Sequence, residues 1–288
     1  MDRRDAGGVT ERIAVALTIA GSDSGGGAGI QADLRTFAAL GVYGASVVTA
    51  LTAQNTQGVR AIHYPPPAIV AAQIEAVLED FAVAAIKIGM LGTAGIVGAA
   101  VAFRSPSPRG CGEWPQKPFI VYDPVMAASS GRTLSGAGFV EAVRRELLPL
   151  VDCLTPNLAE AAALLDEKVA QSEAEMARQG TALLQLGPRA ALVKGGHLAG
   201  EEAVDLLVTA AGVRRYAAPR IATANLHGTG CTLSSAIAAN IALGIALPEA
   251  VAAAKTFVRD AIERGRTIVL GNGPGPLIQI EARPPRRF

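Results

Sequence analysis

The sequence predicts a three-layer α/β domain in which helices flank a largely parallel central sheet. Short apolar runs alternate with helical segments along nearly the whole chain, a pattern typical of a parallel sheet covered on both faces. Several runs, such as residues 13–20 (IAVALTIA), are apolar at almost every position, as strands buried on both faces are. Half of the 288 residues are hydrophobic, which is enough for a well-buried core in one domain.

Each expected element follows from a local signal in the chain. Short apolar runs predict strands at residues 13–20, 43–51, 84–88, 119–123, 153–155 and 190–194. Periodic apolar segments predict helices at residues 30–40, 65–80, 93–103, 136–148, 157–165, 172–186, 229–243 and 248–264. Residues 203–208 and 213–218 predict a β-hairpin beside the sheet. Residues 54–58 predict a polar turn that closes the second strand, and residues 105–118 predict a Pro- and Gly-rich surface loop.

The composition excludes several classes of function. Lys and Arg exceed Asp and Glu by one, so the chain lacks the positive charge that binding a nucleic-acid backbone needs. No apolar run is long enough for a membrane span, and the polar N-terminus does not look like a secretory signal. Three widely spaced cysteines suit a reducing cytoplasm. We expect residues 1–12 to be disordered or loosely held and residues 13–288 to form a single domain.

A glycine-rich loop follows the first predicted strand, in GSDSGGGAGIQAD (residues 21–33). The loop is neither a P-loop nor a dinucleotide fingerprint, because no Gly-Lys-Ser/Thr ends it and Ile30 stands where the third glycine belongs. Its glycines would allow a ligand to approach the backbone closely. Asp33, in the first turn of the next helix, is either a ligand contact or a carboxylate that the helix dipole favours.

Polar residues follow three later strands, at the edge of the sheet where ligands bind in α/β folds. Asp123 ends its strand and could hold a metal, or it could be solvated. Asn157 and Glu160 have capping-box spacing, which by itself favours a structural role. Lys194 would bring a positive charge to the mouth of the sheet.

The segment GTGC, Gly228 to Cys231, leads directly into a predicted helix. Free N–H groups of Gly228, Thr229 and Gly230, together with the helix dipole, would form an anion hole. The same field would lower the pKa of Cys231 below its usual value, although an isolated cysteine at a helix start is more often a packed apolar side chain. With Asp123, Glu160 and Lys194 nearby, this pattern favours phosphoryl transfer over redox chemistry.

Several long segments, in the order in which they occur along the chain, are similar to the motifs of one protein family. The segments AGSDSGGGAGIQAD, YDPVM, LTPNLAEAAALL, LVKGGHL and HGTGCTLSSAIAA resemble the hydroxymethylpyrimidine/phosphomethylpyrimidine kinases of thiamine biosynthesis, which have a ribokinase-like fold. The resemblance extends from about residue 13 to 277. It implies ATP- and Mg²⁺-dependent phosphorylation of 4-amino-5-hydroxymethyl-2-methylpyrimidine, then of its monophosphate to the diphosphate. It also implies a cytoplasmic homodimer.

The resemblance also implies residue roles. Gln54 would read the aminopyrimidine edge, because a carboxamide offers a donor and an acceptor together. The pyrimidine pocket would be lined by Gly21, Asp33, Met90 and Val125. The anion hole would be formed by Gly228, Thr229, Gly230 and Cys231, with Cys231 as the hypothesised proton acceptor. Mg²⁺ would be held by Asp123 and Glu160, and the nucleotide phosphates by Lys194 and Asn157.

The chain departs from the family pattern at three positions, and two other functions stay open. Ser24 replaces a frequent proline, Leu226 a threonine, and Ser129 a loop lysine whose loss puts contacts to ATP in doubt. Residues 105–118 are also longer than expected. The alternatives are a pyridoxal or pyridoxine kinase of the same superfamily, and a non-catalytic pyrimidine-binding module.

Overall fold

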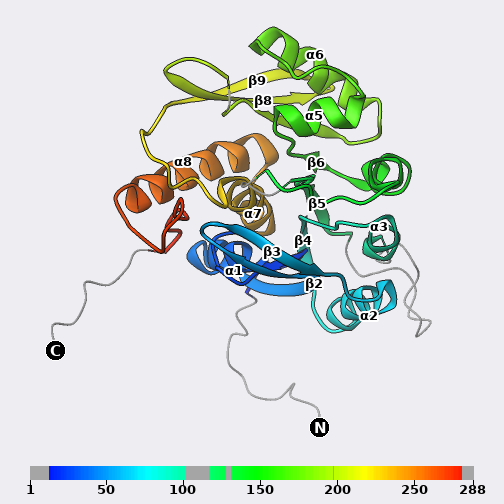
Figure 1. The fold of residues 1–288 in the computed structure, drawn as a ribbon. Coiled ribbons are helices and arrows are strands. Elements are labelled where there is room, and N and C mark those ends of the chain that lie inside the picture. The colour runs from blue at the N-terminus through cyan, green and yellow to red at the C-terminus, as the bar shows by residue number, and fades with distance from the viewer. Residues whose placement is uncertain (1–12, 102–116, 128–130, 197, 281–288) are drawn as a thin grey trace, which may run out of the picture.

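Parallel strands form the centre of the sheet, and antiparallel strands form its two ends (Figure 1). The computed structural model describes residues 13–101, 117–127, 131–196 and 198–280. Its nine strands lie in the order β3-β2-β1-β4-β5-β6-β7-β8-β9. Pairing is parallel from β2 across to β7, whereas β3 pairs antiparallel with β2, and β8 and β9 extend the other end antiparallel.

The strands are β1 (Val15–Asp23), β2 (Tyr43–Asn55), β3 (Gly58–His63), β4 (Val83–Ile88), β5 (Phe119–Tyr122), β6 (Cys153–Leu154), β7 (Ala190–Lys194), β8 (Glu202–Thr209) and β9 (Gly212–Pro219). The helices are α1 (Gly29–Ala39), α2 (Pro67–Leu78), α3 (Ala94–Ala100), α4 (Phe139–Ala142), η2 (Val143–Leu147), η3 (Leu148–Leu150), α5 (Leu158–Leu165), α6 (Glu173–Leu184), α7 (Thr229–Ala242) and α8 (Leu247–Gly265).

Two helical layers cover the two faces of the sheet (Figure 1). One face packs against α2, α3, α5 and α6, and the other packs against α1, α7 and α8. Each face of the sheet has its own hydrophobic core, and alternate residues of a strand pack into opposite cores. Leu17 of β1 belongs to the core beneath α2, α3, α5 and α6, the first core, and Ala16 belongs to the core beneath α1, α7 and α8, the second core. Burial on both faces explains why these strands are nearly continuous apolar runs.

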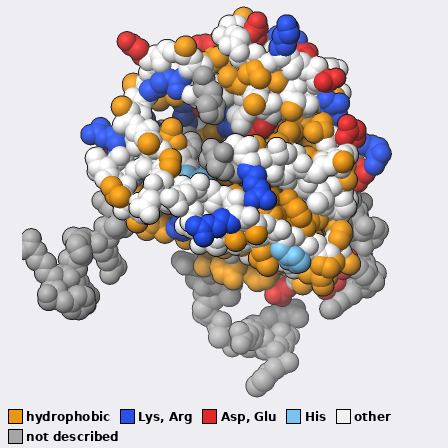
Figure 2. Space-filling view, in the orientation of Figure 1, with side chains coloured by type: hydrophobic (Ala, Val, Ile, Leu, Met, Phe, Trp, Pro, Cys, Tyr) orange, Lys and Arg blue, Asp and Glu red, His pale blue; other side chains and the backbone are white. Residues whose placement is uncertain are grey.

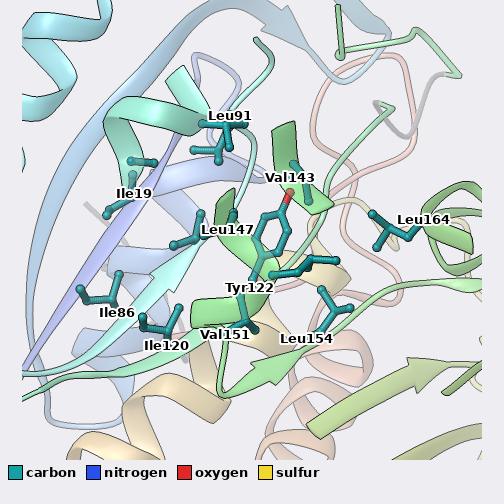
Figure 3. Close-up of a cluster of buried hydrophobic side chains, with 14 of the residues drawn as sticks. Ile19, Ile86, Leu91, Ile120, Tyr122, Val143, Leu147, Val151, Leu154 and Leu164 are labelled. Atoms are coloured by element: carbon teal, nitrogen blue, oxygen red, sulfur yellow. The ribbon is translucent and has the colours of Figure 1, made fainter. Parts of the chain in front are cut away.

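Tyr122 lies in the middle of the first core (Figure 3). Its ring packs among apolar side chains that include Val143, Leu147 and Leu154. The side chain is fully buried, and its hydroxyl has no hydrogen-bond partner among the described residues. Burial raises the pKa of Tyr122 well above its usual value, with Glu160 and Asp123 adding to the rise. The tyrosine is therefore neutral.

The expected fold class is confirmed, and so are most elements. The turn predicted at residues 54–58 is present at residues 56–57, but β2 continues to Asn55 and is followed by the edge strand β3, which the sequence did not predict. The predicted helix 136–148 is a short α-helix that continues as a π-helix and a 3₁₀-helix, and Pro149 cannot donate the next helical hydrogen bond. The expectations for residues 1–12, most of 105–118 and Ser129 lie outside the described residues.

The surface drawn in Figure 2 mixes charges of both signs with apolar and neutral groups. Basic and acidic side chains are interspersed over this face rather than gathered into a patch of one sign. Within the described part of the chain, no helix has both the length and the apolar character that crossing a membrane requires.

Candidate active site

The candidate site lies at the carboxyl edge of the parallel strands, where the N-terminus of α7 meets the ends of β1, β5 and β7. Asp23 is the last residue of β1, Asp123 directly follows β5, and Lys194 ends β7. Gly228 precedes α7 in a left-handed conformation with φ of 88°, which favours glycine. The parallel arrangement therefore brings side chains from distant parts of the sequence to one place.

Two glycine-rich loops pack backbone to backbone at this edge. A β-carbon on Gly228 would overlap the carbonyl oxygen of Gly27, and one on Gly27 would overlap the ring of His227. A side chain at either glycine would push the loops apart. The glycines after β1 thus allow the first loop to fit closely against the loop that begins α7.

Asp23 holds the first glycine loop in shape. Its side-chain carboxylate is buried and accepts hydrogen bonds from the N–H groups of Gly25, Gly27 and Ala28 at 2.8, 3.0 and 2.9 Å. The Nε2 atom of His227 lies 2.9 Å from the same carboxylate. Burial alone would raise the pKa of Asp23, but these hydrogen bonds and the charge of His227 lower it overall. The carboxylate is therefore ionised, and the amides of this loop are already used.

The start of α7 leaves two helix amides available for an anion, and no described group accepts from the N–H of Gly228 before them. The Thr229 N–H donates to the carbonyl oxygen of Leu226 at 3.2 Å, so the prediction that this amide is free was wrong. Among the described residues, no group accepts from the N–H of Gly230 or Cys231. Both lie in the first turn of α7, which is 14 residues long, and the helix dipole adds to their field.

A lysine–carboxylate pair lies beside these two amides. Lys194 Nζ is 2.6 Å from Asp123 Oδ1. A β-carbon on Gly230 would lie 3.1 Å from Lys194 Nζ and 3.3 Å from Asp123 Oδ2. Burial acts to lower the pKa of Lys194, but Asp123 and Glu160 raise it overall, so the lysine is charged. The amides of α7 and the Lys194 ammonium thus form one positive region next to a carboxylate.

Asn157 and Glu160 form the expected capping box at the start of α5. The Asn157 N–H donates to Glu160 Oε2 at 2.7 Å, and the Glu160 N–H donates to Asn157 Oδ1 at 2.9 Å. Burial raises the pKa of Glu160 to about 7, with Lys194 opposing and Asp123 adding to the rise. Asp123 contacts Lys194 and Glu160 interacts with its charge, and a hard cation would prefer the oxygens of these two carboxylates. Among the described residues no group of three or more candidate ligands is found.

Cys231 is partly buried at the third position of α7, and its environment differs from the one we predicted. Burial raises the pKa of Cys231 to about 11, despite the opposing charge of Lys87 and a hydrogen bond from the Gly29 N–H. Asp33 and Asp123 add to the rise. The expected lowering of this pKa was therefore wrong, because burial and two nearby carboxylates outweigh the helix terminus.

A second lysine–carboxylate pair lies deeper, beneath the start of α7. Lys87 Nζ is 2.8 Å from Asp33 Oδ2, and both side chains are fully buried. Asp33 also accepts from the hydroxyls of Thr18, at 2.6 Å, and Ser235, at 2.7 Å. Asp33 therefore belongs to a saturated buried network in this structure, and its contact with a substrate stays a prediction.

The residues predicted for a pyrimidine pocket come together in part. A β-carbon on Gly21 would lie 3.2 Å from the sulfur of Met90. Met90 shares a small apolar cluster with Ala50 and Leu134, and Val125 packs against it. Gln54 projects from the end of β2, and its side-chain amide lies 3.3 Å from Nε2 of His227. Gln54 thus contacts the loop that carries Cys231.

Sequence reasoning missed three residues at the site, although each left a signal. Lys87 stands alone in an apolar strand, and a charge there requires a buried partner. Asp23 precedes a run of glycines whose amides need acceptors. His227 directly precedes the GTGC segment. The partner of Lys87 is 54 residues away and the contact between His227 and Asp23 spans 204 residues, so no local pattern identifies these pairs.

Comparisons with known proteins agree with this geometry. The family described as phosphomethylpyrimidine kinase matches residues 23–277. A hydroxymethylpyrimidine/phosphomethylpyrimidine kinase of Rhizobium meliloti (strain 1021) is 52% identical over 265 residues, covering 92% of this chain and 96% of the relative. The crystal structure of phosphomethylpyrimidine kinase from Clostridium difficile 630 superimposes with a TM-score of 0.74 at 43% identity, covering 87% of this chain and 100% of that one. An ADP complex of Bacillus subtilis pyridoxal kinase superimposes with a TM-score of 0.82 at 33% identity, covering 93% and 98%.

Proposed function

Because the chain belongs to the phosphomethylpyrimidine kinase family, we propose that the two glycine-rich loops and the Lys194–Asp123 pair carry out the phosphoryl transfers of that family. The protein is an ATP-dependent kinase of thiamine biosynthesis that acts on hydroxymethylpyrimidine and on phosphomethylpyrimidine. In the first transfer the hydroxymethyl oxygen bonds to the γ-phosphorus of ATP, and the bond from that phosphorus to the departing ADP breaks. In the second transfer a phosphate oxygen of the monophosphate attacks instead.

One observation carries the assignment: the first turn of α7, where the N–H groups of Gly230 and Cys231 donate to no group among the described residues, lies next to Lys194. These donors would bind the oxygens of the migrating phosphoryl group, where negative charge is concentrated during transfer. Gly228 supports them by allowing the loops to approach, and Thr229 supports them by fixing the loop to Leu226. Asn157 orients the Glu160 carboxylate next to this region.

Asp123 and Glu160 fit Mg²⁺ by the chemistry of their donors. Mg²⁺ uses one or two carboxylates together with water and substrate phosphates, rather than a closed protein cage. Burial raises the pKa of Glu160 and the charge of Asp123 adds to the rise, and a divalent cation beside both carboxylates would oppose it. When bound, the ion would neutralise charge on the ATP phosphates. Asp123 and Lys194 would hold the adjacent groups in place.

Gln54 and the apolar cluster around Met90 are the proposed pyrimidine site. The carboxamide of Gln54 would pair with the ring nitrogen and the amino group of the substrate. Gly21, Met90 and Val125 would contact the ring, and the buried carboxylate of Asp33 would lie below it. The charged and apolar parts of the site then match the two ends of the substrate.

Cys231 is neutral at rest, so it is not a ready-made base. With a pKa of about 11, only about one thiol in 10⁴ is ionised at pH 7. A loose transition state needs little early activation of the attacking oxygen. Cys231→Ala should therefore lower kcat by less than the roughly 10²–10⁴-fold that a general base contributes, with Cys231→Ser as the matched control. A loss within that range in steady-state assays would restore the base role.

The decisive experiment follows products by mass. The protein is incubated with hydroxymethylpyrimidine, ATP and Mg²⁺, and the monophosphate and diphosphate are resolved over time. We expect both, in that order. Pyrimidine binding without ATP consumption would instead indicate a binding module. Pyridoxal is assayed in parallel, because pyridoxal kinases share this fold at 33% identity; a preference for pyridoxal would overturn the substrate assignment.

A homodimer and a cytoplasmic location complete the proposal. Both are family expectations supported by the similarity over 92% of the chain, and the three widely spaced cysteines suit a reducing compartment. Light scattering during size-exclusion chromatography should give about twice the mass of the chain, which is 29.4 kDa. A monomeric mass at working concentration would contradict the dimer.

A further inference from the structure

His227 contacts two functional loops with one atom. Its Nε2 lies 2.9 Å from Asp23 Oδ2 and 3.3 Å from the side-chain amide of Gln54. Asp23 belongs to the glycine loop after β1, and Gln54 lies near the end of β2. Which of these groups donates and which accepts depends on where the proton of His227 sits.

The Asp23 contact decides the position of that proton. The Asp23 carboxylate accepts three backbone N–H groups, so it is ionised and has no proton to give. A bare nitrogen and a carboxylate oxygen would repel each other at 2.9 Å. Nε2 of His227 must therefore carry a hydrogen and donate to Asp23. This holds whether the other ring nitrogen is protonated or not.

The protonated Nε2 in turn decides how the Gln54 carboxamide is oriented. A carboxamide fills nearly the same space in two orientations that exchange its oxygen and nitrogen, and only its hydrogen-bond partners distinguish them. The structure places the Gln54 nitrogen towards His227, where two donors would meet at 3.3 Å, so the oxygen and nitrogen of this carboxamide have to be exchanged. With the oxygen there, an acceptor meets a donor that is shared with Asp23.

Thr52, which contacts the other polar atom of the carboxamide, requires the same orientation of Gln54. Its hydroxyl donates to the carbonyl oxygen of Ser22 at 2.8 Å, so its proton is already used. Thr52 Oγ1 also lies 3.3 Å from the carboxamide atom of Gln54 placed as Oε1, and donation to that oxygen would need a second hydroxyl proton. The hydroxyl can only accept in that contact, so the Gln54 nitrogen must lie on the Thr52 side. Two independent neighbours thus require one orientation.

We propose that Asp23, His227 and Thr52 lock the Gln54 carboxamide in this orientation and thereby determine which pyrimidine edge the enzyme accepts. The inference rests on the proposed role of Gln54 as the reader of the substrate. In this orientation Gln54 keeps one N–H and one oxygen lone pair for the ligand, in a fixed order. That order fits a ring nitrogen next to an amino group. The 4-oxo analogue presents a ring N–H next to a carbonyl, which is the reverse order.

Binding of the two analogues tests the lock. Dissociation constants are measured for 4-amino and 4-oxo forms of 5-hydroxymethyl-2-methylpyrimidine by calorimetry. Wild type should favour the amino form by on the order of 10²-fold or more, because a mismatched polar edge leaves buried groups unpaired. Thr52→Val removes one of the two constraints and leaves His227 alone to hold the carboxamide, so the ratio should fall by about tenfold. Thr52→Ser keeps the hydroxyl and should keep the ratio. An unchanged ratio in Thr52→Val would overturn the lock.

Two further measurements separate the lock from the role of Gln54. If Gln54→Leu leaves the amino/oxo ratio at its wild-type value, Gln54 is not the reader, and the assignment of its role fails together with the lock. If Gln54→Leu abolishes the preference while Thr52→Val retains it, only the lock fails. The tautomer is read directly by ¹⁵N NMR of labelled histidine, with the three histidines assigned by single substitutions. A protonated Nε2 in His227 is expected, and a bare Nε2 would refute the proposal.

Discussion

Two lysine–carboxylate pairs lie beneath the same helix terminus, and they differ in depth and in what surrounds them. Lys87 and Asp33 are fully buried, 2.8 Å apart, and two hydroxyls complete the hydrogen bonds of Asp33. Lys194 and Asp123 are 2.6 Å apart, and the Lys194 side chain keeps 13% of its surface exposed, next to the first turn of α7, where two amides donate to no group in the part of the chain that the structure describes. The deep pair is closed by its own partners, whereas the upper pair can still exchange partners with a ligand.

The difference assigns separate tasks to similar chemical groups. A saturated buried pair contributes mainly to the integrity of the fold, since removal of one partner leaves an uncompensated charge. A pair at the mouth of the sheet can release its lysine to a phosphate when a cation takes the carboxylate. We therefore expect substitutions in the deep pair to affect stability first and those in the upper pair to affect catalysis first.

The largest effect should follow from Lys87→Met. This change leaves Asp33 charged and buried without its cation, which should lower the free energy of unfolding by about 3–5 kcal/mol. Urea denaturation measures the loss, and Lys168→Met, at an exposed lysine, is the matched control. Replacing both partners, by Lys87→Met with Asp33→Leu, should cost less than Lys87→Met alone. A loss below about 1 kcal/mol in the single variant would contradict a structural role for the pair.

Lys194→Met should reduce catalysis more than it reduces the free energy of unfolding, the reverse of Lys87→Met. Loss of one donor to the developing charge should reduce kcat/KM for ATP by about 10²–10³-fold. The stability loss should be smaller than for Lys87→Met, since the Lys194 side chain is partly exposed and Glu160 can take up a proton. Steady-state kinetics and urea denaturation on the same preparations provide both numbers. Equal stability losses in the two variants would remove the distinction between the pairs.

The smallest effect concerns the pH dependence near the upper pair. The pKa of Glu160 is about 7 in the folded protein and 4.5 without its environment, so the folded state binds this proton more tightly. Its contribution to stability is therefore present at low pH and is lost as pH rises from about 4.5 to about 7. Glu160→Gln should remove that loss, making the variant more stable above pH 7 by up to about 3 kcal/mol. Glutamine also preserves the capping box.

Unfolding free energies at several pH values, measured without Mg²⁺, test this sign. Wild type and Glu160→Gln should have similar stability near pH 4.5 and should diverge as pH rises. Parallel curves across this range would mean that Glu160 is not the group that titrates. Added Mg²⁺ should reduce the difference if the ion relieves the crowding of Asp123 and Glu160.

The sequence predicted the architecture well because buried parallel strands leave a clear local pattern. Runs such as residues 84–88 can be recognised without knowing their neighbours, and the order of strands and helices then limits the topology. The edge strand β3 has no such pattern: most of its residues are at least partly exposed, and it exists because β2 offers it hydrogen bonds. The site was predicted in part for the same reason. Asp123, Glu160 and Lys194 follow strands, whereas the orientation of Gln54 depends on His227, 173 residues away.

The Cys231 pKa could not be predicted from the sequence. A helix terminus is visible in the sequence, but burial and the distance to two carboxylates are not. A helix terminus acts to lower the pKa of a thiol, as the sequence indicated. Burial and the two carboxylates, which only the folded chain brings close to Cys231, outweigh that effect.

The close fit between Gly27 and Gly228 has a consequence for how the protein is made. The first loop leaves the ribosome about 200 residues before its counterpart, so the early βα units can fold while the phosphate site does not yet exist. A nascent chain that ends before α7 would carry the region of Gln54 and Met90 without the amides of Gly230 and Cys231. It would also leave uncovered the sheet face that α7 and α8 bury, so the core on that face closes only after the last segment has emerged.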